Sequence, residues 1–306
     1  MAAGRGSRLD FSLRCVDAPA VEPTENPAGD LPSFGNPPLT ETVLTCLFQP
    51  VPGLDMPNLG RFWQTHRAEF EAGRELPAFR HDVEVFDERL PPHALHALPP
   101  TPTEPTRLQL MGKSGERVVE LQSDRIAYHW IQRGQKPYPR FEQILRGFHR
   151  WLEALEGFCE RRVVPIQSEV VYVNHVPPRP LWPLAADRFG VFPGLGVSEP
   201  RVPQGAEEET FEGVWRFRWR EPDARLYVSL SDVTQWVPGA DEDAAPTAEP
   251  RLRLQLQCRA HCGSRESLGA ELERSRAIIV RTFTGIASQE ARRHWELRSP
   301  PHTPAP

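Results

Sequence analysis

The sequence has almost no lysine, and it has no long hydrophobic run. Lys113 and Lys136 are the two lysines among 36 basic residues, so nearly every cation is an arginine. The chain carries 41 acidic residues and a formal charge of −5. This charge argues against a general nucleic-acid binder, although it leaves room for a local basic patch. No apolar stretch approaches about 18 residues, and we therefore expect no membrane span.

The sequence also lacks the marks of a secreted protein. Arg5 and Arg8 near the N-terminus are not followed by an apolar stretch, so we expect no signal peptide. Five cysteines, an odd number at irregular spacing, do not form a disulfide framework, and no Asn-x-Ser/Thr sequon occurs. We therefore expect a cytoplasmic protein with reduced thiols.

Metal and cofactor motifs are missing or incomplete. Cys258 and Cys262 flank His261, but a structural zinc site needs four ligands, and the other cysteines are scattered. Gly112-Lys113-Ser114 is similar to the end of a phosphate-binding loop, but Arg107 stands where that loop requires a glycine. We therefore predict no metal and no cofactor, and we interpret the lysine turn as a hairpin.

Proline is abundant, with 34 residues, and it is concentrated in segments without periodicity. Residues 1–37 are predicted to be a disordered lead-in, and residues 299–306 a disordered tail. Between them lie two segments with regular patterns, residues 38–163 and residues 164–298. We treat these two segments as the halves of the folded part.

Each half shows a strand, a helix, three strands and a second helix, the first helix of the second half being short. In the first half, strands are predicted over 39–50, 107–111, 118–122 and 126–132, and helices over 58–71 and 139–159. In the second half, strands are predicted over 166–176, 214–220, 226–231 and 251–260, and a long helix over 264–286. The pattern predicts an α+β fold, with antiparallel sheet backed by long helices and built from two pseudo-repeated halves.

Five short motifs lie at the boundaries of these elements. They are Pro38-Leu39-Thr40-Glu41, Gln122-x-Asp124-Arg125 leading to Trp130, Tyr138-Pro139-x-Phe141, Glu169-x-x-Tyr172-x-Asn174-His175 and His294-Trp295. Together they resemble a sporadically distributed family of uncharacterised bacterial proteins, over about residues 37–296. The resemblance implies a soluble bacterial protein, and it brings no established activity, cofactor or catalytic residue.

Two groups of polar residues are candidates for a site. Gln122, Asp124 and Arg125 lie at a strand-to-strand turn, where they either satisfy backbone groups or form a polar cluster with His129 or Tyr138.

The second group is Glu169, Asn174 and His175 on one strand. Glu169 and His175 share a face, so they are candidates for acid–base chemistry. A solvated sheet face explains them equally well.

An arginine-rich sheet face is the most distinctive feature. It comprises Arg216, Arg218, Arg220, Arg251, Arg253 and Arg259, all predicted to point away from the core. Acidic residues in 207–212 and 241–243 are able to neutralise it, which would leave a solvated surface. The alternative is a docking surface, because arginine favours contacts with carboxylates, phosphates and aromatic rings.

Three hypotheses follow for the function, in order of preference. The first is a protein-interaction or adaptor module without catalytic activity, which docks an unknown protein partner. The second is a binder of nucleic acid or of an anionic ligand through the arginine face, disfavoured by the net acidity. The third is an enzyme with an unrecognised site near residues 122–130 or 169–175.

Overall fold

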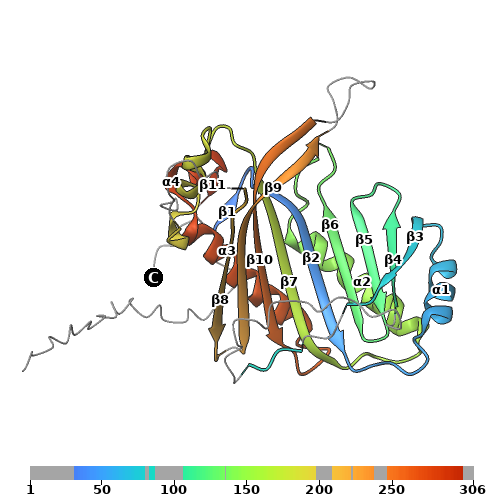
Figure 1. The fold of residues 1–306 in the computed structure, drawn as a ribbon. Coiled ribbons are helices and arrows are strands. Elements are labelled where there is room, and N and C mark those ends of the chain that lie inside the picture. Colours follow the sequence, from blue (N-terminus) through green and yellow to red (C-terminus); the bar gives the residue numbers. More distant parts are fainter. Residues whose placement is uncertain are drawn as a thin grey trace, which may run out of the picture.

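The computed structural model describes residues 31–79, 83–86, 106–134, 136–197, 209–221, 223–237 and 247–298. Nine of its strands are β2 (Leu39–Phe48), β3 (Phe70–Pro77), β4 (Thr106–Gly112), β5 (Arg117–Gln122), β6 (Arg125–Ile131), β7 (Pro165–Val176), β8 (Glu212–Trp219), β9 (Ala224–Val237) and β10 (Thr247–His261). They form one antiparallel sheet in the order β3-β4-β5-β6-β2-β7-β10-β9-β8 (Figure 1). The predicted antiparallel sheet is confirmed.

The centre of the sheet is the antiparallel pair β2 and β7. From β2 the sheet continues outward through β6, β5 and β4, and from β7 through β10, β9 and β8. Both central strands are buried along most of their length. Both strands carry apolar residues on both faces. This suits a central position, because a strand that is covered on both faces needs no polar side facing solvent.

Helices cover one side of the sheet, as predicted (Figure 1). They are α1 (Met56–Thr65), α2 (Phe141–Phe158) and α3 (Leu268–Ile286), whereas the short α4 (Gln289–His294) follows α3 and contacts β11. α2 packs on β6 and β2, α3 packs on β10 and β7, and α1 lies against β4. No helix in the described part of the chain has the length and apolar composition needed to cross a membrane.

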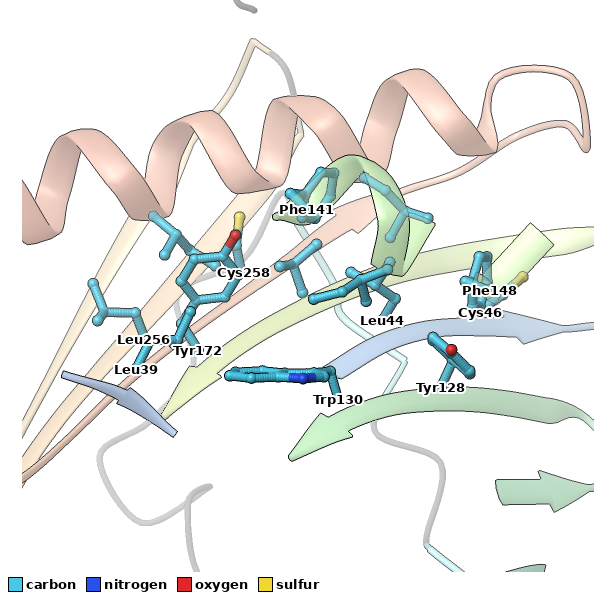
Figure 2. Close-up of a cluster of buried hydrophobic side chains, with 14 of the residues drawn as sticks. Leu39, Leu44, Cys46, Tyr128, Trp130, Phe141, Phe148, Tyr172, Leu256 and Cys258 are labelled. Atoms are coloured by element: carbon cyan, nitrogen blue, oxygen red, sulfur yellow. The ribbon is translucent and has the colours of Figure 1, made fainter. Parts of the chain in front are cut away.

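One main cluster of buried side chains lies between the sheet and the helices. Figure 2 shows part of it, with Leu44, Trp130 and Phe148 from the first half beside Tyr172 and Leu256 from the second. The two halves therefore share one core. A smaller buried cluster of Val43, Ala127, Val171 and Val173 lies apart from it, at the centre of the opposite face.

The first helix ends earlier than its apolar spacing predicts. It was expected over 58–71, but α1 ends at Thr65, and Phe70 opens strand β3. Phe70 is buried and its ring lies 4.8 Å from the ring of Trp151, so it reaches the core from a strand. Gly73 belongs to the same strand, and a Cβ there would lie 3.0 Å from the Trp63 ring.

The first described strand begins at Ser33, inside the segment 1–37 that the sequence assigns to the lead-in. β1 (Ser33–Phe34) pairs with β11 (Leu297–Arg298), and Phe34 is buried against Phe283 with ring centroids 5.2 Å apart. Residues 1–30 and the tail 299–306 lie outside the described residues. Two short 3-10 helices, η2 (Ala185–Gly190) and η3 (Pro193–Leu195), fill part of the connection between β7 and β8.

Candidate functional site

Most of the polar candidates lie on the sheet face turned away from α2 and α3, here called the outer face. Successive strand residues point to opposite faces. Ile126 and Tyr128 belong to the helix-side core, so Arg125 and His129 point to the outer face. By the same alternation, Glu169 and His175 lie on the outer face of β7, whereas Asn174 points to the helix side.

Glu169 lies at the centre of an ion-pair network on the outer face. Its carboxylate accepts hydrogen bonds from Arg125 Nη2 at 3.3 Å and from Arg259 Nε at 2.9 Å. Burial raises the pKa of Glu169, but the two guanidinium groups outweigh burial and hold this pKa below its usual value. Glu169 is therefore a charged anchor for two arginines.

Glu84 extends this network from a segment that crosses the outer face. Its carboxylate binds Arg259 Nη1 at 2.9 Å, and it also binds Arg225 Nη1 and the Tyr227 hydroxyl. Its backbone N–H donates to Gln167 Oε1 at 2.8 Å. Only 2% of its side chain is exposed. Sequence reasoning missed Glu84, since nothing in the local pattern shows that the segment returns to the sheet.

His129 lies between two carboxylates. Its Nδ1 is 2.8 Å from Glu41 Oε1, and its Nε2 is 3.8 Å from Glu120 Oε2. Burial opposes the charged imidazole, but Glu120 and Glu41 outweigh it and raise the pKa of His129 to about 9. For Glu120, burial acts to raise the pKa, but the contact with His129 outweighs burial and lowers this pKa to about 2. A histidine that is already protonated at neutral pH is not available as a general base.

Gln122, at the turn between β5 and β6, binds the backbone of Phe79, which lies just after β3. Gln122 accepts from Phe79 N at 3.0 Å and donates to Phe79 O at 3.1 Å and to Asp124 Oδ1 at 3.0 Å. The Arg125 guanidinium lies 4.7 Å from the Phe79 ring centroid. These contacts favour the backbone-satisfying interpretation of the turn.

The predicted partners of that turn lie elsewhere. His129 belongs to the cluster with Glu120 and Glu41. Tyr138 lies on the helix side, where its hydroxyl is 3.3 Å from the Tyr172 hydroxyl.

Glu169 and His175 do not come together. They are six residues apart on one strand, which corresponds to roughly 20 Å at about 3.3 Å per residue. His175 Nδ1 contacts Thr40 Oγ1 at 3.2 Å, and burial together with Arg253 and Arg251 lowers the pKa of His175. The two side chains therefore cannot act on the same atom of a substrate. Asn174 donates to Leu254 O at 3.2 Å.

Most of the six arginines predicted to form a docking surface have partners within the chain, Arg216 among them. Arg218 donates to Phe86 O at 3.1 Å, Arg251 binds Glu249, Arg253 donates to Gln255, and Arg259 binds Glu84 and Glu169. Arg216 is partly buried on β8, and Arg220 is exposed just beyond that strand. The arginine face is largely internally paired, and its cations are not generally available to a partner.

A hairpin arm, formed by residues 233–237 and 247–251, extends beyond the rest of the sheet at the top of Figure 1. β10 pairs with β7 only from Leu252 onward, and β8 pairs with β9 only as far as Ser231. The arm is therefore a two-stranded ribbon whose outer edges pair with no described strand. Trp236 on the arm is 69% exposed. Sequence analysis missed the arm, although the β-prone run at 233–237 was a signal for it.

The described residues contain no group of three or more His, Cys, Asp or Glu side chains placed to hold a metal ion. Cys258 is buried, and burial raises the pKa of its thiol to about 12. The chain matches no protein-family model and no curated protein. The site is therefore interpreted from its own geometry.

Proposed function

We propose that the chain is a protein-interaction module without catalytic activity, and that it binds an extended segment of a partner protein along the 233–237 edge of the arm. The segment would add to the arm as a third strand, with main-chain hydrogen bonds supplying affinity. The observation that carries this proposal is a strand edge that pairs with no described strand and bears no charge, together with the exposed Trp236.

Comparison with the two ends of the sheet supports this choice of edge. Proteins protect exposed strand edges with charges, prolines or short strands, because a bare edge pairs with any other strand. β3 carries Glu71, Arg74, Glu75 and Pro77, and β8 carries Arg216 and Arg218. Residues 233–237 contain no charge and no proline. An edge left without these devices is suited to a partner strand.

The two edges of the arm also differ in whether they can accept an added strand. The β10 edge contains Pro250, which has no N–H to donate to an added strand. The β9 edge has no such interruption, and it carries Trp236. Tryptophan is enriched among the residues that dominate binding energy at interfaces. The partner chemistry that fits is an uncharged, β-prone segment with an apolar side chain opposite the indole.

Selection from a displayed library of random 12-residue peptides tests the proposal. Immobilised full-length protein should select peptides rich in β-branched and aromatic residues. The variants Trp236→Ser and Thr234→Lys should lose these peptides while keeping the melting temperature of the parent. The matched control is Phe217→Ser, which removes an exposed ring from the charged edge strand β8 and should leave binding unchanged. Selected peptides that bind all three variants equally would contradict the proposal.

Binding of nucleic acid or of an anion through the arginine face is the second candidate. Most of its arginines already have partners in the chain, which weakens it. An enzyme near residues 122–130 or 169–175 is the third, weakened by the charged state of His129 and by the distance between Glu169 and His175.

We also propose that the two halves are a structural repeat and that the chain belongs to the bacterial family its motifs resemble. Support for a repeat comes from the strand order, in which β2 followed by β6, β5 and β4 corresponds to β7 followed by β10, β9 and β8. We propose a cytoplasmic location as well, and this rests on the odd number of cysteines and the lack of a sequon in the sequence.

A further inference from the structure

A half-enclosed recess lies on the helix side of the sheet, separate from the arm edge. It is bounded by β7, by the chain just before α2, by the second half of α3 and by residues 32–39. About 540 Å³ of it is free of protein atoms, part of which is open to solvent. Its apolar walls are formed by Pro32, Phe34, Pro37, Leu39, Val280 and Phe283. Such walls suit an aromatic or branched apolar group.

Polar groups converge on the same recess. Tyr138 and Tyr172 line it, and their hydroxyl oxygens are 3.3 Å apart. Burial raises the pKa of both tyrosines, so both hydroxyls stay protonated and able to donate. Asn174 also lines it, and its amide already donates to Leu254 O. Apolar walls with a few convergent polar groups are the usual composition of a small-molecule site.

The charge of the lining is positive. Arg140 and Arg276 line the recess, and none of the lining residues is acidic. Arg276 Nη1 binds Glu142 Oε1 at 2.8 Å, and its guanidinium lies 4.8 Å from the Phe141 ring centroid, so the group is held in place. Arg276 Nε is buried and makes no hydrogen bond within the described residues. An anionic group in the recess would be attracted by the guanidinium groups of Arg140 and Arg276.

Arg140 is held beside the recess in an unusual conformation. Its φ is 73°, a region that favours glycine, and its Nη1 donates to Phe34 O at 3.2 Å. A non-glycine residue is kept in such a conformation only where its surroundings impose it, and these residues cluster at binding sites. Arg140 thereby links the 32–39 segment to the start of α2.

We propose that this recess binds a small aromatic monocarboxylate, with its ring between Phe34, Val280 and Phe283 and its carboxylate on Arg276. Arginine binds a carboxylate through parallel N–H donors, and this charged contact is what separates an acid from its neutral amide. The proposal concerns a different surface from the strand edge of the arm, so either can fail without the other.

Fluorine NMR on the full-length protein tests it, with para-(trifluoromethyl)phenylacetate as the probe and its neutral amide as the matched ligand. The acid should bind at least about 10-fold more tightly than the amide, because only the acid pairs with the guanidinium. Arg276→Gln should bring the acid down to the affinity of the amide. Arg274→Gln, on the same helix but paired with Glu271, is the control and should leave both affinities unchanged.

A second variant keeps the test valid if Arg276→Gln fails to fold. Val280→Trp should fill the recess and abolish binding of both ligands while the far-UV circular dichroism spectrum is unchanged. Equal binding of acid and amide, loss of binding with Arg274→Gln to the same extent, or no binding of the acid at millimolar concentration would overturn the proposal.

Discussion

The cluster formed by Glu41, Glu120 and His129 predicts how the stability of the fold depends on pH. The folded state raises the pKa of His129 from 6.5 to about 9. A pKa raised by folding means that the folded state binds the proton more tightly than the unfolded chain does. The difference corresponds to about 3 kcal/mol of unfolding free energy. This contribution is fully present below pH 6.5, declines as the pH rises from 6.5 to 9, and is lost above pH 9.

The variant His129→Gln isolates this contribution. Urea unfolding of the wild type and of the variant, measured from pH 6 to pH 10, gives a difference in unfolding free energy in which the other titrating groups largely cancel. The difference should shrink by about 3 kcal/mol between pH 6.5 and pH 9.5. The low pKa of Glu120 reflects the same contact, so its effect is not added to that of His129.

Two results would refute this reasoning. The first is a difference between wild type and variant that stays constant within about 0.5 kcal/mol across the range, which is the usual scatter of surface substitutions. The second is an NMR titration that gives His129 a pKa at or below 6.5. Either result would mean that the two carboxylates do not hold the imidazole in its charged form.

Other predictions concern the core and the outer face, and all are measured by urea unfolding. Trp151→Ala removes a side chain that is 6% exposed and should cost about 3–5 kcal/mol; a loss below about 1 kcal/mol would contradict the packing. Gly147→Ala should cost about 1–3 kcal/mol, because the new Cβ would lie 2.5 Å from the buried Tyr128 hydroxyl. Gly157→Ala on the same helix meets nothing within 4 Å and should gain up to about 1 kcal/mol; equal effects of the two alanines would contradict the close approach. Glu84→Gln removes the carboxylate that pairs with the buried Arg225 and should cost about 3–5 kcal/mol; a neutral effect would mean that residues 83–86 do not lie against the sheet.

The sequence predicted those elements whose side-chain period is unambiguous. The alternation in β10 and the apolar stripe of α2 correctly predicted which face of each element is buried. β3 was missed because Phe70 continues the apolar spacing of the preceding helix, and only its contact with Trp151 shows that it belongs to a strand. The spacing of apolar residues alone does not show where a helix ends and the chain turns back as a strand.

The site was harder to predict for a related reason. Which residues share a strand face follows from alternation, which grouped Glu169 with His175 and directed Arg259 away from the core. Their pairing depends on the register between β7 and β10, and the arrival of Glu84 depends on a segment far away in sequence. The recess likewise joins Tyr138, Tyr172 and Arg276 from three elements, and no spacing in the chain links them.

Backbone amide hydrogen exchange, with and without a selected peptide, tests the central proposal most directly. The account predicts that the peptide slows exchange at residues 233–237, where an added strand would form hydrogen bonds, and leaves the amides of β8 and β3 unchanged. Protection confined to β8 or to the outer face, with residues 233–237 exchanging as fast as in the free protein, would contradict it.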